Sequence, residues 1–169
     1  MIYRTVLDSR HSRRDALRLL GAAGVVMGVG GCGVSSAEQT RFPVHLPDAE
    51  WRRRLTHAQY RVLRGAWTER AYSSALNAEY RAGTFQCAGC RKPLFSSAAK
   101  FDSGNGWPSF YAALPEAVGK KLDHSLLFPR VAVHCADCGG HLGHVFNDGP
   151  RPTGKRYCMN GAALTFRAA

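Results

Sequence analysis

The pattern of hydrophobic and polar positions predicts a short helix at the start of the folded part of the chain. Leu55, Tyr60 and Leu63 can share one helical face. Thr56 and Gln59 have the spacing of a capping box, in which each side chain bonds the backbone N–H of the other residue. The helix is therefore expected to begin near Thr56.

From Gly83 onward the apolar stretches become short and are interrupted by Gly, Pro, Asn and Asp. This pattern predicts short strands with frequent turns, and hence an antiparallel β fold. Examples of such stretches are residues 84–86, 93–95, 126–128 and 131–133. We therefore expect residues 51–169 to form a mainly β domain of small antiparallel sheets with short flanking helices.

A basic stretch and a short apolar run precede this domain. Residues 1–18 carry five arginines against two aspartates, and residues 19–31 contain no charged side chain. This layout is typical of an export signal, because the apolar run is too short to span a bilayer. Residues 12–17 (SRRDAL) resemble the twin-arginine signal. Residues 1–32 are therefore expected to be a twin-arginine signal peptide that delivers the protein to the periplasm or to the outer face of a membrane.

Two features of this leader allow alternatives. Residues 29–32 (VGGC) resemble a lipoprotein cleavage box, which would place a lipid on Cys32, whereas cleavage near residues 35–37 is the competing interpretation. An amphipathic first helix with a glycine-rich linker is a weaker alternative, since so many glycines make a poor helix. Residues 33–50 contain two prolines and no clear periodicity, so they are expected to be a linker.

Composition and charge narrow the class of protein. The chain has 169 residues, of which 45% are hydrophobic and 21% charged, which suits one domain with an appendage and excludes a disordered polymer. The formal net charge of +11 allows nucleic acid, anionic lipid or an acidic substrate as a partner. Apart from residues 52–54 the basic side chains are scattered. We therefore expect no nucleic-acid binding, and membrane contact only through the leader or its lipid.

Four of the six cysteines form two C-x-x-C pairs separated by 44 residues. A zinc ion takes four thiolates in a tetrahedron, and such a closed shell leaves no open position for chemistry. The spacing therefore predicts one structural zinc ion per subunit that staples distant parts of the β domain. Its expected ligands are Cys87, Cys90, Cys135 and Cys138.

Two other uses of these cysteines are weaker. Thioredoxin-type dithiols come with a βαβ pattern that this chain does not display. A Cys₂His₂ site could instead use His141 and His144 with the second cysteine pair. That histidine spacing is shorter than usual, and the choice would leave Cys87 and Cys90 without a role.

Cys158 is the cysteine left over in the domain. A lone thiol with histidines elsewhere in the chain is a candidate nucleophile, although free cysteine is more commonly a small buried hydrophobe. Arg156 lies two residues earlier and would favour the thiolate. Tyr157 and Asn160 are also unlike a plain core run. We therefore predict that Cys158 is the nucleophile.

From about residue 55 to residue 166 the chain resembles the peptide-methionine (R)-S-oxide reductases, the B type of methionine sulfoxide reductase. The resemblance rests on several long motifs in the family's order. These motifs are LTxxQYxVL at 55–63, TER at 68–70, both C-x-x-C pairs, FDSGxGWPSF at 101–110, HLGHVFxDGP at 141–150 and RYCxN at 156–160.

The resemblance implies thiol-dependent reduction of the R epimer of methionine sulfoxide in proteins, which repairs oxidative damage. In this chemistry a histidine such as His144 protonates the sulfoxide oxygen while Cys158 attacks the sulfur and becomes a sulfenic acid. The implied catalytic residues are Cys158, His144, His141 and Asn160, and the implied substrate-binding residues are Trp107, Phe110, Arg156 and Asp148. Support of the neighbouring cysteine pair is the alternative role for His141. The implied partners are oxidised proteins and a thioredoxin-like or other thiol reductant, and we expect a monomer.

The chain departs from the family at two places. Asn105 stands where many members carry a resolving cysteine, so we expect an external thiol to reduce the sulfenic acid directly. Residues 131–132 are Val-Ala where the family often has Thr-Glu, which predicts a small change in the polarity of the site. The rival hypothesis is a zinc-ribbon binding module that uses a basic surface and has no need of Cys158.

Overall fold

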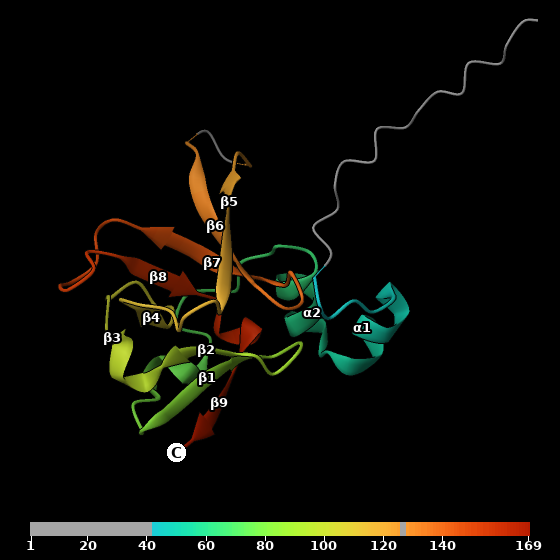
Figure 1. Ribbon diagram of the computed structural model, residues 1–169, viewed down its shortest axis with the longest axis horizontal. Coiled ribbons are helices and arrows are strands. Elements are labelled where there is room, and N and C mark those ends of the chain that lie inside the picture. The colour runs from blue at the N-terminus through green and yellow to red at the C-terminus, as the bar shows by residue number, and fades with distance from the viewer. Residues whose placement is uncertain (1–41, 126–127) are drawn as a thin grey trace, which may run out of the picture. The chain divides into compact units, whose positions relative to one another are not determined.

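The computed structural model describes residues 42–125 and 128–169 (Figure 1). The expected signal peptide at residues 1–32 and the first part of the expected linker lie outside these ranges, as do residues 126–127 of one predicted strand. Among the described residues, no helix combines the length and the apolar character needed to cross a membrane.

Two short helices lie next to each other beside the β-sheets, α1 (Asp48–Arg54) and α2 (His57–Leu63) (Figure 1). The start of α2 is confirmed, because the Thr56 hydroxyl accepts a hydrogen bond from the Gln59 backbone N–H and the Gln59 side chain accepts one from the Thr56 N–H. Helix α1 extends into the end of the expected linker, at residues 48–50. Its buried Trp51 joins Leu63 of α2 in the hydrophobic core.

The strands form two antiparallel sheets, as predicted. The smaller sheet has the order β2-β1-β9, and the larger one has the order β3-β4-β8-β7-β6-β5. Figure 1 shows the hairpin of β5 and β6 projecting from the rest of the larger sheet. The strands are β1 (Gly83–Cys87), β2 (Pro93–Ser96), β3 (Lys100–Phe101), β4 (Ser109–Phe110), β5 (Val118–Asp123), β6 (Arg130–Cys135), β7 (His141–Phe146), β8 (Arg156–Met159) and β9 (Leu164–Ala168).

Three of the four predicted strand segments are confirmed, namely residues 84–86, 93–95 and 131–133. The fourth, at 126–128, is wrong at its one described residue. Phe128 lies in the connection between β5 and β6 and is 76% exposed. An apolar residue in a turn gives the same local signal as one in a strand, so the pattern alone does not separate them.

The two sheets meet at a cluster of fully buried aromatic rings. Phe85 of β1 and Phe95 of β2 come from the smaller sheet, and Phe110 of β4 comes from the larger sheet. The rings of Phe95 and Phe110 stack with centroids 4.4 Å apart, and Phe85 meets Phe110 edge-on at 4.9 Å. Each buried ring stabilises the fold by roughly 1.5–3 kcal/mol, so this cluster holds β4 and its neighbour β8 in place.

Candidate active site and metal site

The strand register of the larger sheet places three polar side chains in a row. Cys158 of β8 pairs with Ser109 of β4 on one side and with His144 of β7 on the other. Directly paired residues of antiparallel strands point to the same face of the sheet. The candidate nucleophile and the candidate proton donor are therefore brought together by the backbone pairing itself.

A cavity of about 130 Å³ opens over this row. Its lining residues are Thr68, Trp107, Arg130, Gly143, His144, Phe146, Cys158 and Asn160. Four of the residues that the sequence assigns to the site, namely Trp107, His144, Cys158 and Asn160, thus share one cavity. A space of this volume admits one side chain and little more.

A carboxylate on the neighbouring hairpin binds His144. The Asp123 Oδ2 lies 2.7 Å from the His144 Nε2 and 2.9 Å from a guanidinium nitrogen of Arg130. Hydrogen bonds from Ser125, from His144 and from Arg130 hold the pKa of Asp123 well below its usual range. Asp123 is therefore a carboxylate at neutral pH, and it favours an imidazole that carries a proton on Nε2.

His141 differs from His144 in its surroundings. Its ring packs edge-on against the His144 ring at 5.3 Å, and it does not line the cavity over Cys158. Its buried Nε2 has no hydrogen-bond partner among the described residues. Burial lowers the pKa of His141 to about 4, with a further contribution from His144. His141 is therefore neutral at pH 7 and supports His144 by packing, so of the two histidines His144 is placed to donate a proton.

Trp107 and Asn160 are both held by the segment around Glu69. The Trp107 Nε1–H donates to the Glu69 carbonyl at 3.2 Å, and the Asn160 Oδ1 accepts from the Glu69 N–H at 2.9 Å. The Asn160 Nδ2 donates to the Leu142 carbonyl at 3.1 Å. Asn160 is buried and thus fixes one wall of the cavity by pairing polar backbone groups.

Burial is the dominant influence on Cys158. It raises the pKa of the Cys158 thiol above the ordinary value, while the Arg156 guanidinium and the Ser109 hydroxyl act in the opposite direction. The predicted effect of Arg156 thus has the expected sign but is outweighed by burial. In the substrate-free site most of the thiol is therefore protonated at pH 7.

Arg156 is itself fixed by Asp148. Its guanidinium makes two hydrogen bonds to the Asp148 carboxylate, at 2.9 and 2.7 Å, and lies over the Phe146 ring at 4.5 Å. Neither Arg156 nor Asp148 lines the cavity over Cys158. From outside the cavity, the Arg156 guanidinium packs on the cavity-lining Phe146, and Asp148 holds that positive charge near Cys158.

Phe110 lies elsewhere than the resemblance implies. It is fully buried in the aromatic cluster between the sheets and does not line the cavity over Cys158. Successive residues of a strand alternate between the two faces. Because Ser109 faces the row with Cys158, Phe110 faces the core. Its role is to position β4, which is a correction to the implied substrate contact.

Several site residues have no role in the sequence-based prediction. Thr68 and Phe146 line the cavity and belong to the TER and HLGHVF motifs, so the motifs could have suggested them. Ser109 likewise belongs to the FDSGxGWPSF motif. Asp123 lies outside every motif and reaches His144 only through the pairing of β5, β6 and β7.

The four cysteines of the two C-x-x-C pairs form one cluster, in which all sulfur atoms lie within 4.8 Å of one another. The Cys87 and Cys138 sulfurs are 3.7 Å apart, and the Cys90 and Cys135 sulfurs are 3.5 Å apart. A tetrahedron with metal–sulfur bonds of about 2.3 Å has edges of about 3.8 Å, so the donor set fits a metal ion. The neighbouring sulfurs raise the pKa of Cys87 and lower that of Cys135. Four thiolates at this spacing could share one metal ion.

The cluster brings together cysteines from both sheets. One pair begins at Cys87, the last residue of β1 in the smaller sheet, and the other begins at Cys135, the last residue of β6 in the larger sheet. His141 and His144 do not belong to the cluster, which removes the Cys₂His₂ alternative. A metal ion here would connect two sheets that share no ladder of backbone hydrogen bonds.

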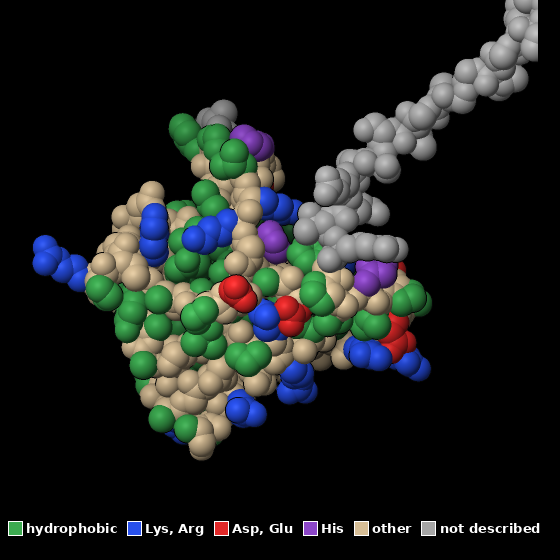
Figure 2. All heavy atoms as spheres, viewed as in Figure 1, with side chains coloured by type: hydrophobic (Ala, Val, Ile, Leu, Met, Phe, Trp, Pro, Cys, Tyr) green, Lys and Arg blue, Asp and Glu red, His purple; other side chains and the backbone are tan. Residues whose placement is uncertain are grey.

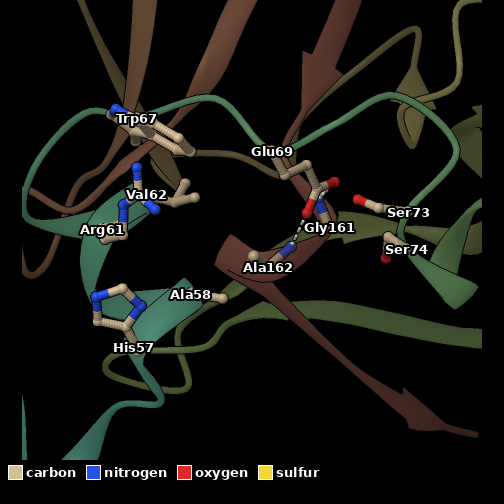
Figure 3. A pocket seen from close by; sticks show the side chains of 10 residues that line it. All are labelled: His57, Ala58, Arg61, Val62, Trp67, Glu69, Ser73, Ser74, Gly161 and Ala162. Carbon is tan, nitrogen blue, oxygen red and sulfur yellow. Dashed lines mark hydrogen bonds between the residues drawn. The ribbon is translucent and has the colours of Figure 1, made fainter.

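A larger cavity of about 450 Å³ does not contain Cys158. Figure 3 shows Arg61 and Trp67 on one side of it and Glu69, Ser73 and Ser74 on the other. Thr68 faces the smaller cavity, whereas its neighbours Trp67 and Glu69 face this one. The two cavities are thus separated by the backbone of residues 67–69, a segment that belongs to no helix or strand.

Comparison with known proteins identifies the family to which this chain belongs. The sequence profile of the SelR domain matches residues 55–168, which is most of the described chain. This chain belongs to the SelR domain family. A relative from Leptospira interrogans, "Peptide methionine sulfoxide reductase MsrB", is 50% identical over 127 residues, which cover 75% of this chain and 97% of the relative. The predicted resemblance to the B-type reductases is therefore confirmed.

Other members of the SelR domain family are similarly close. The "Peptide methionine sulfoxide reductase MsrB" of Leifsonia xyli is 52% identical over 133 residues, which cover 78% of this chain and 96% of the relative. "Peptide methionine sulfoxide reductase B1, chloroplastic" of Arabidopsis thaliana is 50% identical over 136 residues, covering 80% of this chain and 67% of the relative. The SelR domain of this chain is thus matched along nearly its whole length.

Proposed function

We propose that this SelR-domain protein reduces the R epimer of methionine sulfoxide in proteins to methionine, with Cys158 as the nucleophile. The observation that carries the proposal is the row of Ser109, Cys158 and His144 beneath a cavity of about 130 Å³ walled by Trp107. Among the described cysteines, Cys158 is the free thiol that lies outside the metal cluster. The MsrB names of the relatives support the same reaction.

The reaction transfers the sulfoxide oxygen to Cys158. The Cys158 thiolate attacks the sulfoxide sulfur and forms an S–S bond, while the sulfoxide oxygen takes a proton from His144 and becomes a hydroxyl. The proton that the Cys158 thiol gives up replaces the one that His144 donates, so the step takes up no net proton. The hydroxyl then passes to the Cys158 sulfur as the S–S bond breaks, which releases methionine and leaves a sulfenic acid. The substrate sulfur is reduced by two electrons and the Cys158 sulfur is oxidised by two, so the step needs no other redox partner.

His144 supplies the proton in this proposal, and Asp123 is its positioning residue. The Asp123 carboxylate fixes the imidazole ring through Nε2 and stabilises the charged imidazolium. Trp107 offers an aromatic wall for the S-methyl group through sulfur–aromatic contact. A site fixed in this way accepts the sulfoxide oxygen on the histidine side and the methyl group on the indole side, which selects one epimer.

An external thiol completes the cycle. Asn105 is exposed on the loop before Trp107 and carries no sulfur for an internal disulfide. We propose that one thiol of a thioredoxin-like protein, or a small thiol, attacks the sulfenic acid, releases water and forms a mixed disulfide with Cys158. A second thiol of the reductant then regenerates the Cys158 thiol.

Zinc is the metal that we propose for the four-cysteine cluster. Four thiolate donors at tetrahedral spacing suit zinc, and a closed shell of this kind stabilises structure without taking part in the reaction. One ion per monomer would hold β1 and β6, and with them the two sheets, in a fixed relation. The cluster therefore contributes to folding more than to catalysis.

Export by the twin-arginine route is a separate part of the proposal and rests on the sequence of residues 1–32. It places the enzyme in the periplasm or, with a lipid on Cys32, on the outer face of a membrane. Mass spectrometry of the mature amino terminus of the expressed protein tests both the cleavage that accompanies export and the lipidation of Cys32. An uncleaved Met1 would contradict export, and a free Cys32 thiol would contradict lipidation.

The assay that tests the central proposal uses both sulfoxide epimers of a peptide with dithiothreitol as the reductant. The wild type is expected to consume the R epimer alone, and Cys158→Ser is expected to lose this activity by at least about 10³-fold. Thermal unfolding of Cys158→Ser checks that any loss of activity does not come from a disturbed fold. Equal turnover by Cys158→Ser and the wild type would exclude Cys158 as the nucleophile.

The rival hypothesis of a basic binding module gains little support from the surface. On the face drawn in Figure 2, the Lys and Arg side chains are scattered among uncharged ones. The arginines at residues 52–54 are paired with acidic residues of their own helix, Arg52 with Asp48 and Arg53 and Arg54 with Glu50. Three arginines against two carboxylates leave this helix with a net charge of only +1, which offers little to an anionic polymer.

A further inference from the structure

The cavity over Cys158 is too small for a polypeptide. About 130 Å³ accommodates an oxidised methionine side chain, so the backbone and the neighbouring side chains of a protein substrate must lie outside it. Two larger cavities flank it. One of about 290 Å³ shares the wall made by Trp107, and the other of about 450 Å³ lies behind residues 67–69.

The first of these, the Lys100 cavity, holds a buried cation. Lys100 is 9% exposed, its Nζ donates to the Asn77 carbonyl at 2.7 Å, and it lies 3.7 Å from the centroid of the Tyr80 ring. No carboxylate lies within 4 Å of this ammonium group in the described part of the chain. Burial lowers the pKa of Lys100, while the more distant carboxylates of Asp102, which lines the same cavity, and of Glu79 act in the opposite direction. A buried cation without a direct ion-pair partner gains from a carboxylate that comes within contact distance of it.

The second, the Arg61 cavity, repeats this arrangement of a cation on an aromatic ring. The Arg61 guanidinium lies 3.1 Å from the centroid of the Trp67 ring, and it also has no ion-pair partner in residues 42–125 or 128–169. The carboxylate of Glu69, on the opposite wall, accepts hydrogen bonds from the backbone N–H groups of Gly161 and Ala162 (Figure 3). Glu69 is thus engaged by the backbone, and Arg61 stays available to an incoming group.

Exposed aromatic residues gather at the same two places. Five large hydrophobic residues in the described part of the chain are exposed, and three of them line these cavities, namely Trp67 at 54%, Tyr72 at 72% and Tyr80 at 55%. Apolar surface that is concentrated beside a reactive site marks a region where a partner binds. Its combination with unpaired cations indicates a partner that is partly apolar and carries negative charge.

We propose that the Lys100 cavity and the Arg61 cavity bind acidic side chains on the two sides of the oxidised methionine in a polypeptide substrate. This inference rests on the proposed function and specifies its substrate class as protein segments in which glutamate or aspartate flanks the methionine. The aromatic rings contact the aliphatic part of each flanking residue, and the cations pair with its carboxylate. Trp107 and residues 67–69 separate these contacts from the reacting sulfur.

The test uses pentapeptides with methionine R-sulfoxide at the centre and dithiothreitol as the reductant. Five peptides are compared, each with two flanking residues on either side of the methionine sulfoxide. The reference peptide has Gln at all four flanking positions. In the others, Glu replaces Gln on the amino-terminal side, on the carboxyl-terminal side or on both sides, or Lys replaces Gln on both sides. We expect kcat/KM of the wild type to rise about threefold for each acidic side and about tenfold for both, mainly through KM. The Lys peptide should be the poorest substrate.

Variants assign each side to a cavity. Arg61→Gln is expected to lose the preference on one side of the methionine, and Lys100→Gln is expected to lose it on the other side. Arg167→Gln is the matched control. Arg167 is exposed on β9 and lines neither cavity, and its substitution removes the same positive charge. If Lys100→Gln lowers the melting temperature, Tyr80→Ala tests the same cavity at an exposed ring without removing the buried cation.

The outcomes separate this inference from the proposed function. Glu peptides that are no better than Gln peptides for the wild type would overturn the inference while leaving the reductase activity intact. Equal losses in Arg61→Gln and Arg167→Gln would also overturn it, since net charge alone would then explain the preference. A wild type that turns over none of the peptides would instead contradict the proposed function.

Discussion

Replacing Asp123 by asparagine tests whether this carboxylate keeps His144 in the form that donates a proton. The asparagine side chain has nearly the same shape as that of aspartate, and its amide oxygen can still accept the hydrogen bond that His144 Nε2 donates at 2.7 Å. The substitution removes the negative charge beside the imidazole, together with the ion pair to Arg130 and the carboxylate oxygen that accepts the Ser125 N–H. A loss of activity would therefore report on the carboxylate and the bonds it makes.

The size of the effect follows from the burial of the pair. The side chains of His144 and Asp123 are 11% and 18% exposed, so solvent screens their interaction only in part. A hydrogen bond to a charged group contributes about 1.5–3 kcal/mol, and the neutral amide retains some of this. We expect a loss of about 1.5 kcal/mol of transition-state stabilisation, which lowers kcat about tenfold at neutral pH.

The charge of Asp123 is present throughout the pH range of the assay. Hydrogen bonds hold the pKa of Asp123 well below its usual range, so the carboxylate stays ionised from pH 5.5 to 9. Removing that charge should therefore lower kcat at every pH in this range.

The assay is steady-state reduction of the R epimer by the wild type, Asp123→Asn and the control Asp48→Asn from pH 5.5 to 9. Asp48 lies on α1 and pairs with Arg52 at the surface, so its variant should follow the wild-type profile. Thermal unfolding of each variant checks the fold. A kcat of Asp123→Asn that equals the wild-type value at every pH would refute the role of the carboxylate beside His144.

Three further predictions concern the frame of the site. Removal of the proposed zinc ion by a chelator, or the variant Cys135→Ser, should lower the melting temperature by about 10 °C, as scanning calorimetry would measure, because the proposed link between the sheets is lost. Gly143→Ala should cost about 1–3 kcal/mol in chemical denaturation and reduce kcat, since its Cβ would lie 2.1 Å from the Cys158 carbonyl oxygen. Asn160→Ala should cost about 1–3 kcal/mol and raise KM, because the Glu69 N–H and the Leu142 carbonyl lose their partner. A melting temperature unchanged by chelation, or wild-type behaviour of either variant, would contradict the corresponding account.

The local parts of the fold could be predicted because their causes are local. The capping box at Thr56 and Gln59 fixes the start of α2, and the two C-x-x-C pairs specify their cluster through spacing alone. Cys158 could be singled out by elimination once the other cysteines had a use. Each of these inferences needs only the residues themselves and a short range of sequence.

The remaining features depend on how strands pair, which the sequence does not display. The assignment of Phe110 to the substrate fails because a neighbouring pair such as Ser109 and Phe110 divides between the two faces of a strand, and the motif does not say which face belongs to the site. The effect of Arg156 on Cys158 was predictable in sign, yet its balance against burial depends on how many groups pack around the thiol. Asp123 lies 21 positions before His144 and meets it only through two consecutive strand pairings.

The departure from the family at residues 131–132 acquires a physical meaning from the register. Ala132 pairs directly with His144 across β6 and β7, so a glutamate at this position would stand next to the imidazole. In this chain the position is apolar and buried, and the carboxylate that contacts His144 comes from Asp123 at the end of β5. Arg130, the strand partner of Asp123, binds the same carboxylate and holds it at the rim of the cavity. The site therefore depends on the hairpin of β5 and β6 for the carboxylate that contacts His144.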